Sequence, residues 1–146
     1  MYHAIDLGQN TNLRSVHFGR IKINQVSYVY GKEPLSWMQM MISQINSSQM
    51  EELRFLIEVD FFHDLNRIDW NMLDRLFTQP RFSRLKKIQF DVQRVGCVNS
   101  SSAGIWIKPK LPACDARRIL SIRDARYAPN KAGPVGELRS WRRNNP

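Results

Sequence analysis

The segment ELRFLIEVDF, residues 52–61, decides the fold class of this chain. Its apolar residues stand at every second position, as Leu53, Phe55, Ile57, Val59 and Phe61. A period of two places such side chains on one face of an extended strand and the residues between them on the other face. We therefore predict a strand near residues 53–60 with one buried face and one polar face.

The same strand pattern recurs along the chain. NLRSVHF (12–18) and RLKKIQFDV (84–92) share the spacing L-x-x-apolar-x-apolar, which predicts strands near 13–18 and 86–92. RILSIR (118–123) gives a weaker fourth copy through Leu120 and Ile122. The copies begin at Leu13, Leu53, Leu85 and Leu120, so they are about 32 to 40 residues apart, which is within the range of stacked structural repeats.

Helical signals fill the gaps between these strands. Pro34 suits a first helical turn, and the apolar residues that follow at three- and four-residue steps predict a helix near 34–45. Asp69 can cap a second helix near 69–78, with an apolar stripe formed by Met72, Leu73, Leu76 and Phe77. In the third gap, after the loop-like NSSSAG, Pro109 and Pro112 exclude one continuous helix and favour two short turns. The methionines at 38, 40, 41, 50 and 72 are interpreted as core residues.

Strands joined by helices imply an α/β fold with parallel pairing and helices on one side of the sheet. The expected architecture is a short, irregular, curved solenoid of three to four strand–helix units. Its core should join Leu73, Leu76 and Phe77 of the second helix to Ile57, Ile88 and Phe90 of the strands. Side chains facing away from the helices would form a polar face of mixed sign, and the same pattern also fits a sheet face that is merely solvated. The protein-binding candidates on that face are His17, Arg54, Glu58, Lys87, Gln89, Asp91 and Arg123, with Asp60 beside them and Gln89 expected in solvent.

The positive charge is concentrated near the C-terminal end. The whole chain carries a formal net charge of +9, and residues 108–146 contribute +7 of it, with 10 Lys/Arg against 3 Asp/Glu. From Arg126 onward the chain is rich in proline, glycine and basic residues, which predicts a disordered tail over 126–146. A solubilising extension is the favoured interpretation, because Trp141 is the one tryptophan that the tail offers for base stacking and single-strand binders use several stacking residues; the alternative is an arm that binds nucleic acid.

Composition and motifs argue against other classes of protein. Residues 1–11 lack the layout of a secretory signal, and no apolar run approaches the roughly 20 residues that span a bilayer, so a location in the cytoplasm or nucleus is expected. Cys97 and Cys114 are then expected to be reduced thiols. The histidines lie in no metal-ligand motif, and the serine-elbow and phosphate-loop motifs do not occur. His63 and Asp64 are interpreted as loop residues that point apart, so we expect no enzyme activity, metal or cofactor.

The order of these segments resembles a known family. MEELRFLIEVDFFHDLNRIDWNMLDRLFTQPRFSRLKKIQFDV (50–92), followed by IKPKLPACDARRILSIR (107–123), looks like the leucine-rich-repeat portion of F-box-type proteins of mushroom-forming fungi. The resemblance covers about residues 12–123. It implies repeats that hold a substrate for a ubiquitin ligase of the Skp/cullin/F-box type. About a dozen residues precede the first strand, which is too few for F-box helices, so recruitment of the ligase by the usual route is not expected.

Two functional hypotheses follow. The leading one is a non-enzymatic protein-interaction domain at residues 12–125, resembling the substrate-recognition repeats of an F-box-type adaptor and binding an unidentified protein. The alternative is a nucleic-acid-binding protein that uses the basic C-terminal segment. The two differ in salt dependence, because binding through the tail should weaken steeply as salt rises.

Overall fold

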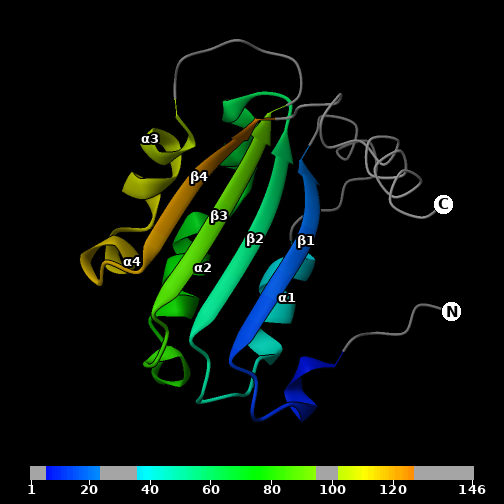
Figure 1. Ribbon diagram of the computed structural model, residues 1–146, viewed down its shortest axis with the longest axis vertical. Coiled ribbons are helices and arrows are strands. Elements are labelled where there is room, and N and C mark those ends of the chain that lie inside the picture. Colours follow the sequence, from blue (N-terminus) through cyan, green and yellow to red (C-terminus); the bar gives the residue numbers. More distant parts are fainter. Residues whose placement is uncertain (1–5, 24–35, 95–101, 127–146) are drawn as a thin grey trace, which may run out of the picture.

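The computed structural model describes residues 6–23, 36–94 and 102–126. Four parallel strands form one sheet whose spatial order is the chain order, so each strand lies beside its predecessor (Figure 1). They are β1 (Ser15–Ile23), β2 (Glu52–Val59), β3 (Lys87–Arg94) and β4 (Leu120–Arg126). The predicted α/β class with parallel pairing is confirmed, and β4 confirms the weak fourth copy of the strand pattern.

Helices connect successive strands and lie on one face of the sheet. They are α1 (Ser36–Gln44), α2 (Trp70–Phe77), α3 (Ala103–Ile107) and α4 (Pro112–Ala116), and short 3-10 helices occupy Leu7–Gln9, Phe62–Arg67, Pro80–Phe82 and Lys108–Lys110. Figure 1 shows α1 and α2 behind the sheet, with α3 and α4 beyond its β4 side. No described helix covers the face toward the viewer, and we call this face, formed by the strand side chains that point away from α1 and α2, the open face.

The side chains on the covered face form a ladder across the strands. Phe18, Phe55 and Phe90 occupy paired positions of β1, β2 and β3. Their rings stack with centroid separations of 4.8 Å and 5.0 Å. All six residues predicted to form one core, from α2 and from β2 and β3, are buried in a single hydrophobic cluster. The inward half of the alternating pattern therefore predicted the core correctly.

Local capping explains where α2 begins and ends. The Asp69 carboxylate accepts a hydrogen bond from the backbone N–H of Met72 at 3.0 Å, as an N-cap does. The helix ends at Phe77, shortly before Pro80. Met72 itself is 41% exposed, so the interpretation of this residue as core is wrong, and the same holds for Met40 in α1.

The third connection contains two short helices, as the two prolines predicted. Pro112 begins α4, and the Asp74 carboxylate of α2 accepts hydrogen bonds from the backbone N–H groups of Ala113 and Cys114, both at 3.1 Å. This carboxylate satisfies backbone donors that the first turn of α4 would otherwise leave unpaired. One strand position was mispredicted: β2 ends at Val59, and Phe61 is 48% exposed where the alternation predicted burial.

Several expectations fall on residues outside the described ranges. These are the tail after Arg126, the start of the first helix at Pro34, the NSSSAG loop and Cys97. Within the described ranges, no helix is long and apolar enough to cross a membrane.

Candidate protein-binding site on the open face

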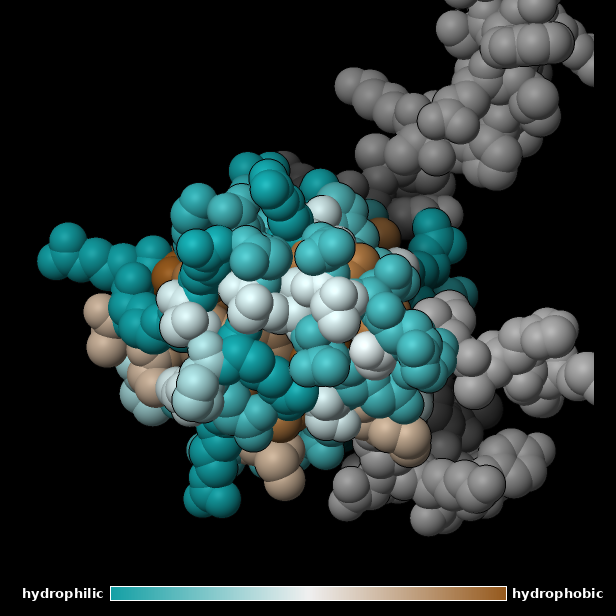
Figure 2. All heavy atoms as spheres, turned by 90° about the horizontal axis from the view of Figure 1, so that it is seen from below, coloured by the Kyte–Doolittle hydropathy of each residue, from teal (hydrophilic) through white to brown (hydrophobic). Residues whose placement is uncertain are grey.

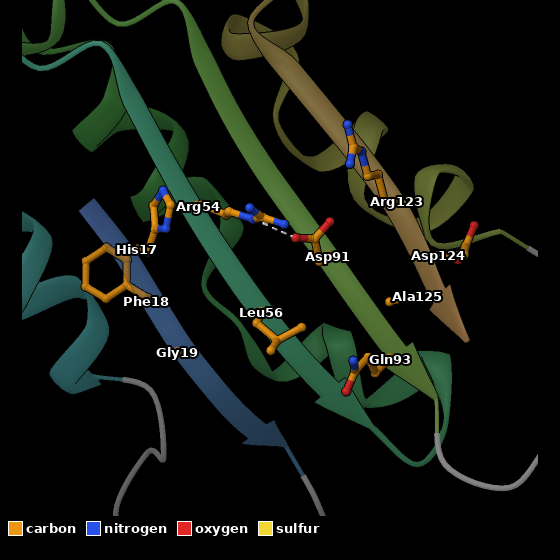
Figure 3. A pocket seen from close by; sticks show the side chains of 10 residues that line it. All are labelled: His17, Phe18, Gly19, Arg54, Leu56, Asp91, Gln93, Arg123, Asp124 and Ala125. Carbon is orange, nitrogen blue, oxygen red and sulfur yellow. Dashed lines mark hydrogen bonds and ion pairs between the residues drawn. The ribbon is translucent and has the colours of Figure 1, made fainter. Parts of the chain in front are cut away.

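The register of the strands arranges the open face in lateral rows. One row joins His17, Arg54, Gln89 and Ser121 across the four strands, and the next joins Leu56, Asp91 and Arg123. Around the second row the surface forms a hollow of about 550 Å³. Its lining residues are His17, Phe18, Gly19, Arg54, Leu56, Asp91, Gln93, Arg123, Asp124 and Ala125, and Figure 3 shows them on all four strands.

A hydrogen-bonded network lies in the middle of this face. The Nε atom of Arg54 donates to Oδ2 of Asp91 at 2.9 Å, and this ion pair is drawn in Figure 3. The amide nitrogen of Gln89 donates to both carboxylate oxygens of Asp91, at 2.9 and 3.0 Å. Asp91 thus accepts three hydrogen bonds from side chains, two of them from its own strand.

The polar side of β3 is not solvated as predicted. Gln89 is 1% exposed and Asp91 is 7% exposed, although both face away from the helices. The expectation that Gln89 lies in solvent is therefore wrong. The physical reason is that the long side chain of Arg54, from the neighbouring strand, pairs with Asp91 and screens both groups from water.

The other predicted residues fall into two groups. His17, Arg54, Asp91 and Arg123 line the hollow together. Glu58 and Lys87 lie outside the hollow's lining and form ion pairs with neighbouring strands: Glu58 with Arg20 and Lys22 of β1 at 3.5 and 3.8 Å, and Lys87 with Glu52 of β2 at 3.8 Å. Asp60 lies just past the end of β2 and is exposed.

Sequence reasoning missed six lining residues, namely Phe18, Gly19, Leu56, Gln93, Asp124 and Ala125. Four of them, Gly19, Leu56, Gln93 and Ala125, carry a usable signal, because counting by two from His17, Arg54, Asp91 and Arg123 reaches them. Phe18 and Asp124 fall outside this count, because Phe18 belongs to the covered face and Asp124 is paired in register with the buried Val92.

The open face carries charged groups of both signs. Figure 2 shows the neighbouring end of the molecule, where the strands begin, and that surface is mostly hydrophilic with small separate hydrophobic patches. Glu52, Glu58 and Asp91 each face a basic side chain of an adjacent strand. Arg123 is exposed, and no hydrogen bond or ion pair joins its side chain to another residue of the described ranges.

The residues considered for catalysis that the structure describes are His63, Asp64 and Cys114. His63 and Asp64 lie in the 3-10 helix Phe62–Arg67, and their Nε2 and Oδ1 atoms are 3.7 Å apart, so the expectation that they point apart is wrong. The Asp64 carboxylate accepts a hydrogen bond from the Phe61 backbone N–H, which closes this turn. Burial, followed by a hydrogen bond with Asp74, raises the pKa of the Cys114 thiol to about 12, and a protonated thiol is a poor nucleophile. No group of three or more potential metal ligands occurs in the described ranges.

Comparisons with protein-family models, with curated proteins and with solved structures found no match.

Proposed function

We propose that this chain is a non-enzymatic protein-interaction module that binds a partner protein through the open face. The observation that carries the proposal is the buried Gln89–Asp91–Arg54 network on that face. A sheet face that is merely solvated has no need of a buried carboxylate, because leaving that group in water avoids the desolvation penalty. A network of this kind instead fixes the orientation of its exposed member, which here is the Arg54 guanidinium.

We further propose that the strands and helices form a short leucine-rich-repeat-like solenoid. The ring ladder of Phe18, Phe55 and Phe90 supports this, because stacked repeats place equivalent side chains in register. A recurrent contact between successive units supports it too. Arg81 donates to the carbonyls of Ser43 and Ile45 at the end of α1, and Arg117 donates to that of Phe77, which ends α2.

The resemblance to F-box repeat proteins adds a class of partner to the proposal. Repeats of that kind would hold the substrate of a ubiquitin ligase, and the open face is the surface on which this chain would hold it. Ligase components are then candidate partners as well, reached directly or through the bound protein.

Nucleic-acid binding through the basic C-terminal block is the second candidate, and its net charge of +7 favours it. The described part of that block weakens the case. Lys108 pairs with Asp115 at 3.6 Å, Lys110 donates to Asn66 at 2.9 Å, and Arg117 donates to backbone carbonyls. These three cations already have partners within the fold, and phosphate contacts would compete with them.

The test is the affinity of the purified chain for a partner first isolated by affinity capture and then purified. Arg54→Ala combined with Lys87→Ala should weaken binding by at least about tenfold, or ~1.4 kcal/mol. The matched control is Arg75→Ala combined with Lys108→Ala, which removes the same two charges from surfaces off the open face.

A third variant separates the two candidate functions. Replacing the tail arginines Arg139, Arg142 and Arg143 by glutamine should leave partner binding within about twofold and leave its salt dependence shallow, because face contacts depend on particular side chains. If instead the tail variant abolishes binding and the open-face variant does not, the chain binds through its basic segment and the proposal is wrong.

A further inference from the structure

The Arg54 guanidinium is held in place yet keeps part of its hydrogen-bonding capacity. Its Nε atom is bonded to Asp91, whose carboxylate is fixed in turn by Gln89. Within the described ranges, no residue accepts a hydrogen bond from the two Nη atoms, and the side chain remains 44% exposed. A guanidinium fixed at one edge presents its remaining donors in a planar fork, a geometry that suits a carboxylate.

A second cation stands on the same hollow. Arg123 of β4 is paired in register with Asp91 of β3, and it lines the hollow from the far side. It is exposed and makes no ion pair with any residue that the structure describes. The Asp91 carboxylate is paired with Arg54, and the other acidic lining residue, Asp124, accepts a hydrogen bond from the backbone N–H of Ala103 in α3 at 2.9 Å. Arg123 is therefore the charged lining side chain that has no partner among the described residues.

The floor of the hollow includes short and apolar side chains. Asp91 stands between the two arginines, and Leu56 lies on β2 in the same row as Asp91 and Arg123. Gly19 of β1 and Ala125 of β4 add two short side-chain positions to the lining. A Cβ atom added at Gly19 would meet nothing within 4 Å, so the space above this residue is open. Four strands at a spacing of about 4.8 Å span roughly 14 Å, the length of about four extended residues.

We propose that this hollow takes an extended acidic segment of a partner protein. One carboxylate lies against the Nη atoms of Arg54, a second lies against Arg123, and an apolar side chain rests on Leu56. Acidic residues separated by one position stand roughly 7 Å apart along an extended peptide, and the long arginine side chains cover the remaining distance. The inference rests on the proposed function and specifies the chemistry of the partner.

The same face is poorly suited to nucleic acid. A phosphate backbone carries regularly spaced negative charges and binds best to a surface of one sign. Glu52, Glu58 and Asp91 interrupt such a surface here. A short peptide can place its few carboxylates against the arginines and avoid these groups.

Asp91 provides a sharp test, because its charge and its positioning role predict opposite outcomes. If net charge alone governed binding, Asp91→Asn would strengthen the binding of an acidic peptide by removing a repelling carboxylate. In our proposal it weakens binding, since the neutral amide holds Arg54 less firmly and no longer accepts both bonds from Gln89. Asp91 is thus a positioning residue, and the sign of the change distinguishes this role from simple attraction.

The experiment selects peptides from a random seven-residue display library on the full chain and measures the affinity of the synthesised consensus peptide. We expect two Asp or Glu positions separated by one residue, and a loss of at least about tenfold, ~1.4 kcal/mol, when they are replaced by Asn or Gln. Arg54→Gln, Arg123→Gln and Asp91→Asn should each weaken binding, whereas Arg75→Gln should not. Denaturant unfolding of each variant ensures that folded proteins are compared.

The outcomes separate this inference from the proposed function. Selection of no peptide, selection of peptides without acidic positions, or tighter binding by Asp91→Asn overturns the inference. If the peptides are not acidic but still lose affinity with Arg54→Gln, the open face binds protein and only its acidic preference is wrong. If the peptides bind the Arg54→Gln, Arg123→Gln double variant as they bind the wild type, and a twelve-residue oligothymidylate competes for the chain, both proposals fail.

Discussion

Replacing Phe90 by alanine tests the core that holds the open face in place. The ring is fully buried; it stacks on Phe55 at 5.0 Å and meets Trp70 edge-on at 5.5 Å. Emptying a buried aromatic site costs about 3–5 kcal/mol of unfolding free energy. Aromatic pairs add about 0.5–1.5 kcal/mol beyond area burial, so two lost pairs place Phe90→Ala in the upper half of that range.

Gln89→Ala and Phe61→Ala give the scale for comparison. Gln89 donates to both oxygens of buried Asp91, and its truncation leaves Asp91 with the Arg54 bond alone and should cost about 1–3 kcal/mol. Phe61 is 48% exposed, and its truncation should cost less than about 1 kcal/mol. The predicted order of destabilisation is Phe90→Ala, then Gln89→Ala, then Phe61→Ala.

Urea unfolding measures this order through the midpoints, provided that the slope stays constant. A Gln89→Ala cost no greater than that of Phe61→Ala would mean that the buried network at Asp91 does not form. A Phe90→Ala cost below about 1.5 kcal/mol would refute the ring ladder itself.

Three further predictions concern the α2–α4 end of the structure. Arg117→Met should lower the unfolding free energy by about 1.5–3 kcal/mol in urea melts, because its guanidinium donates to the carbonyls of Phe77, Phe82 and Leu85. An effect smaller than that of Thr78→Ala would count against these hydrogen bonds. Asp74→Ala should cost about 1–2 kcal/mol in thermal melts through loss of the α4 cap, and an unchanged midpoint would contradict the capping role. Native Cys114 should resist alkylation at pH 8, as read by peptide mass mapping, and should react quickly once unfolded. The folded protein holds the thiol proton more tightly than the unfolded chain, because the pKa of Cys114 is raised to about 12. The free energy of unfolding should therefore keep this contribution below about pH 9 and lose it as the pH rises toward 12, and Cys114→Ala should abolish that pH dependence.

The inward-facing half of the fold follows from local sequence, and the outward-facing half does not. Alternation at Leu53, Phe55 and Ile57 predicted β2 because the period of a strand is a property of the local backbone. Burial of Gln89 and Asp91 depends on Arg54, which is 35 or more residues away in sequence and arrives only through strand pairing.

Element ends show the same limit. The alternation in ELRFLIEVDF continues to Phe61, but the strand ends at Val59, where the chain turns into the 3-10 helix Phe62–Arg67. Predicting the hollow would have required the register of all four strands, since its lining residues come from every strand. Once that register is known, Gly19, Leu56, Gln93 and Ala125 follow by counting two positions from His17, Arg54, Asp91 and Arg123.

Site-specific photo-crosslinking to the purified partner tests the central claim most directly. A photoreactive residue in place of Gln93 lies in the hollow of the open face, and one in place of Arg75 lies on the exposed side of α2. We predict a cross-linked adduct from position 93, its loss on addition of the acidic consensus peptide, and no adduct from position 75. An adduct from position 75 and none from position 93 would place the partner on the helices and contradict binding through the open face.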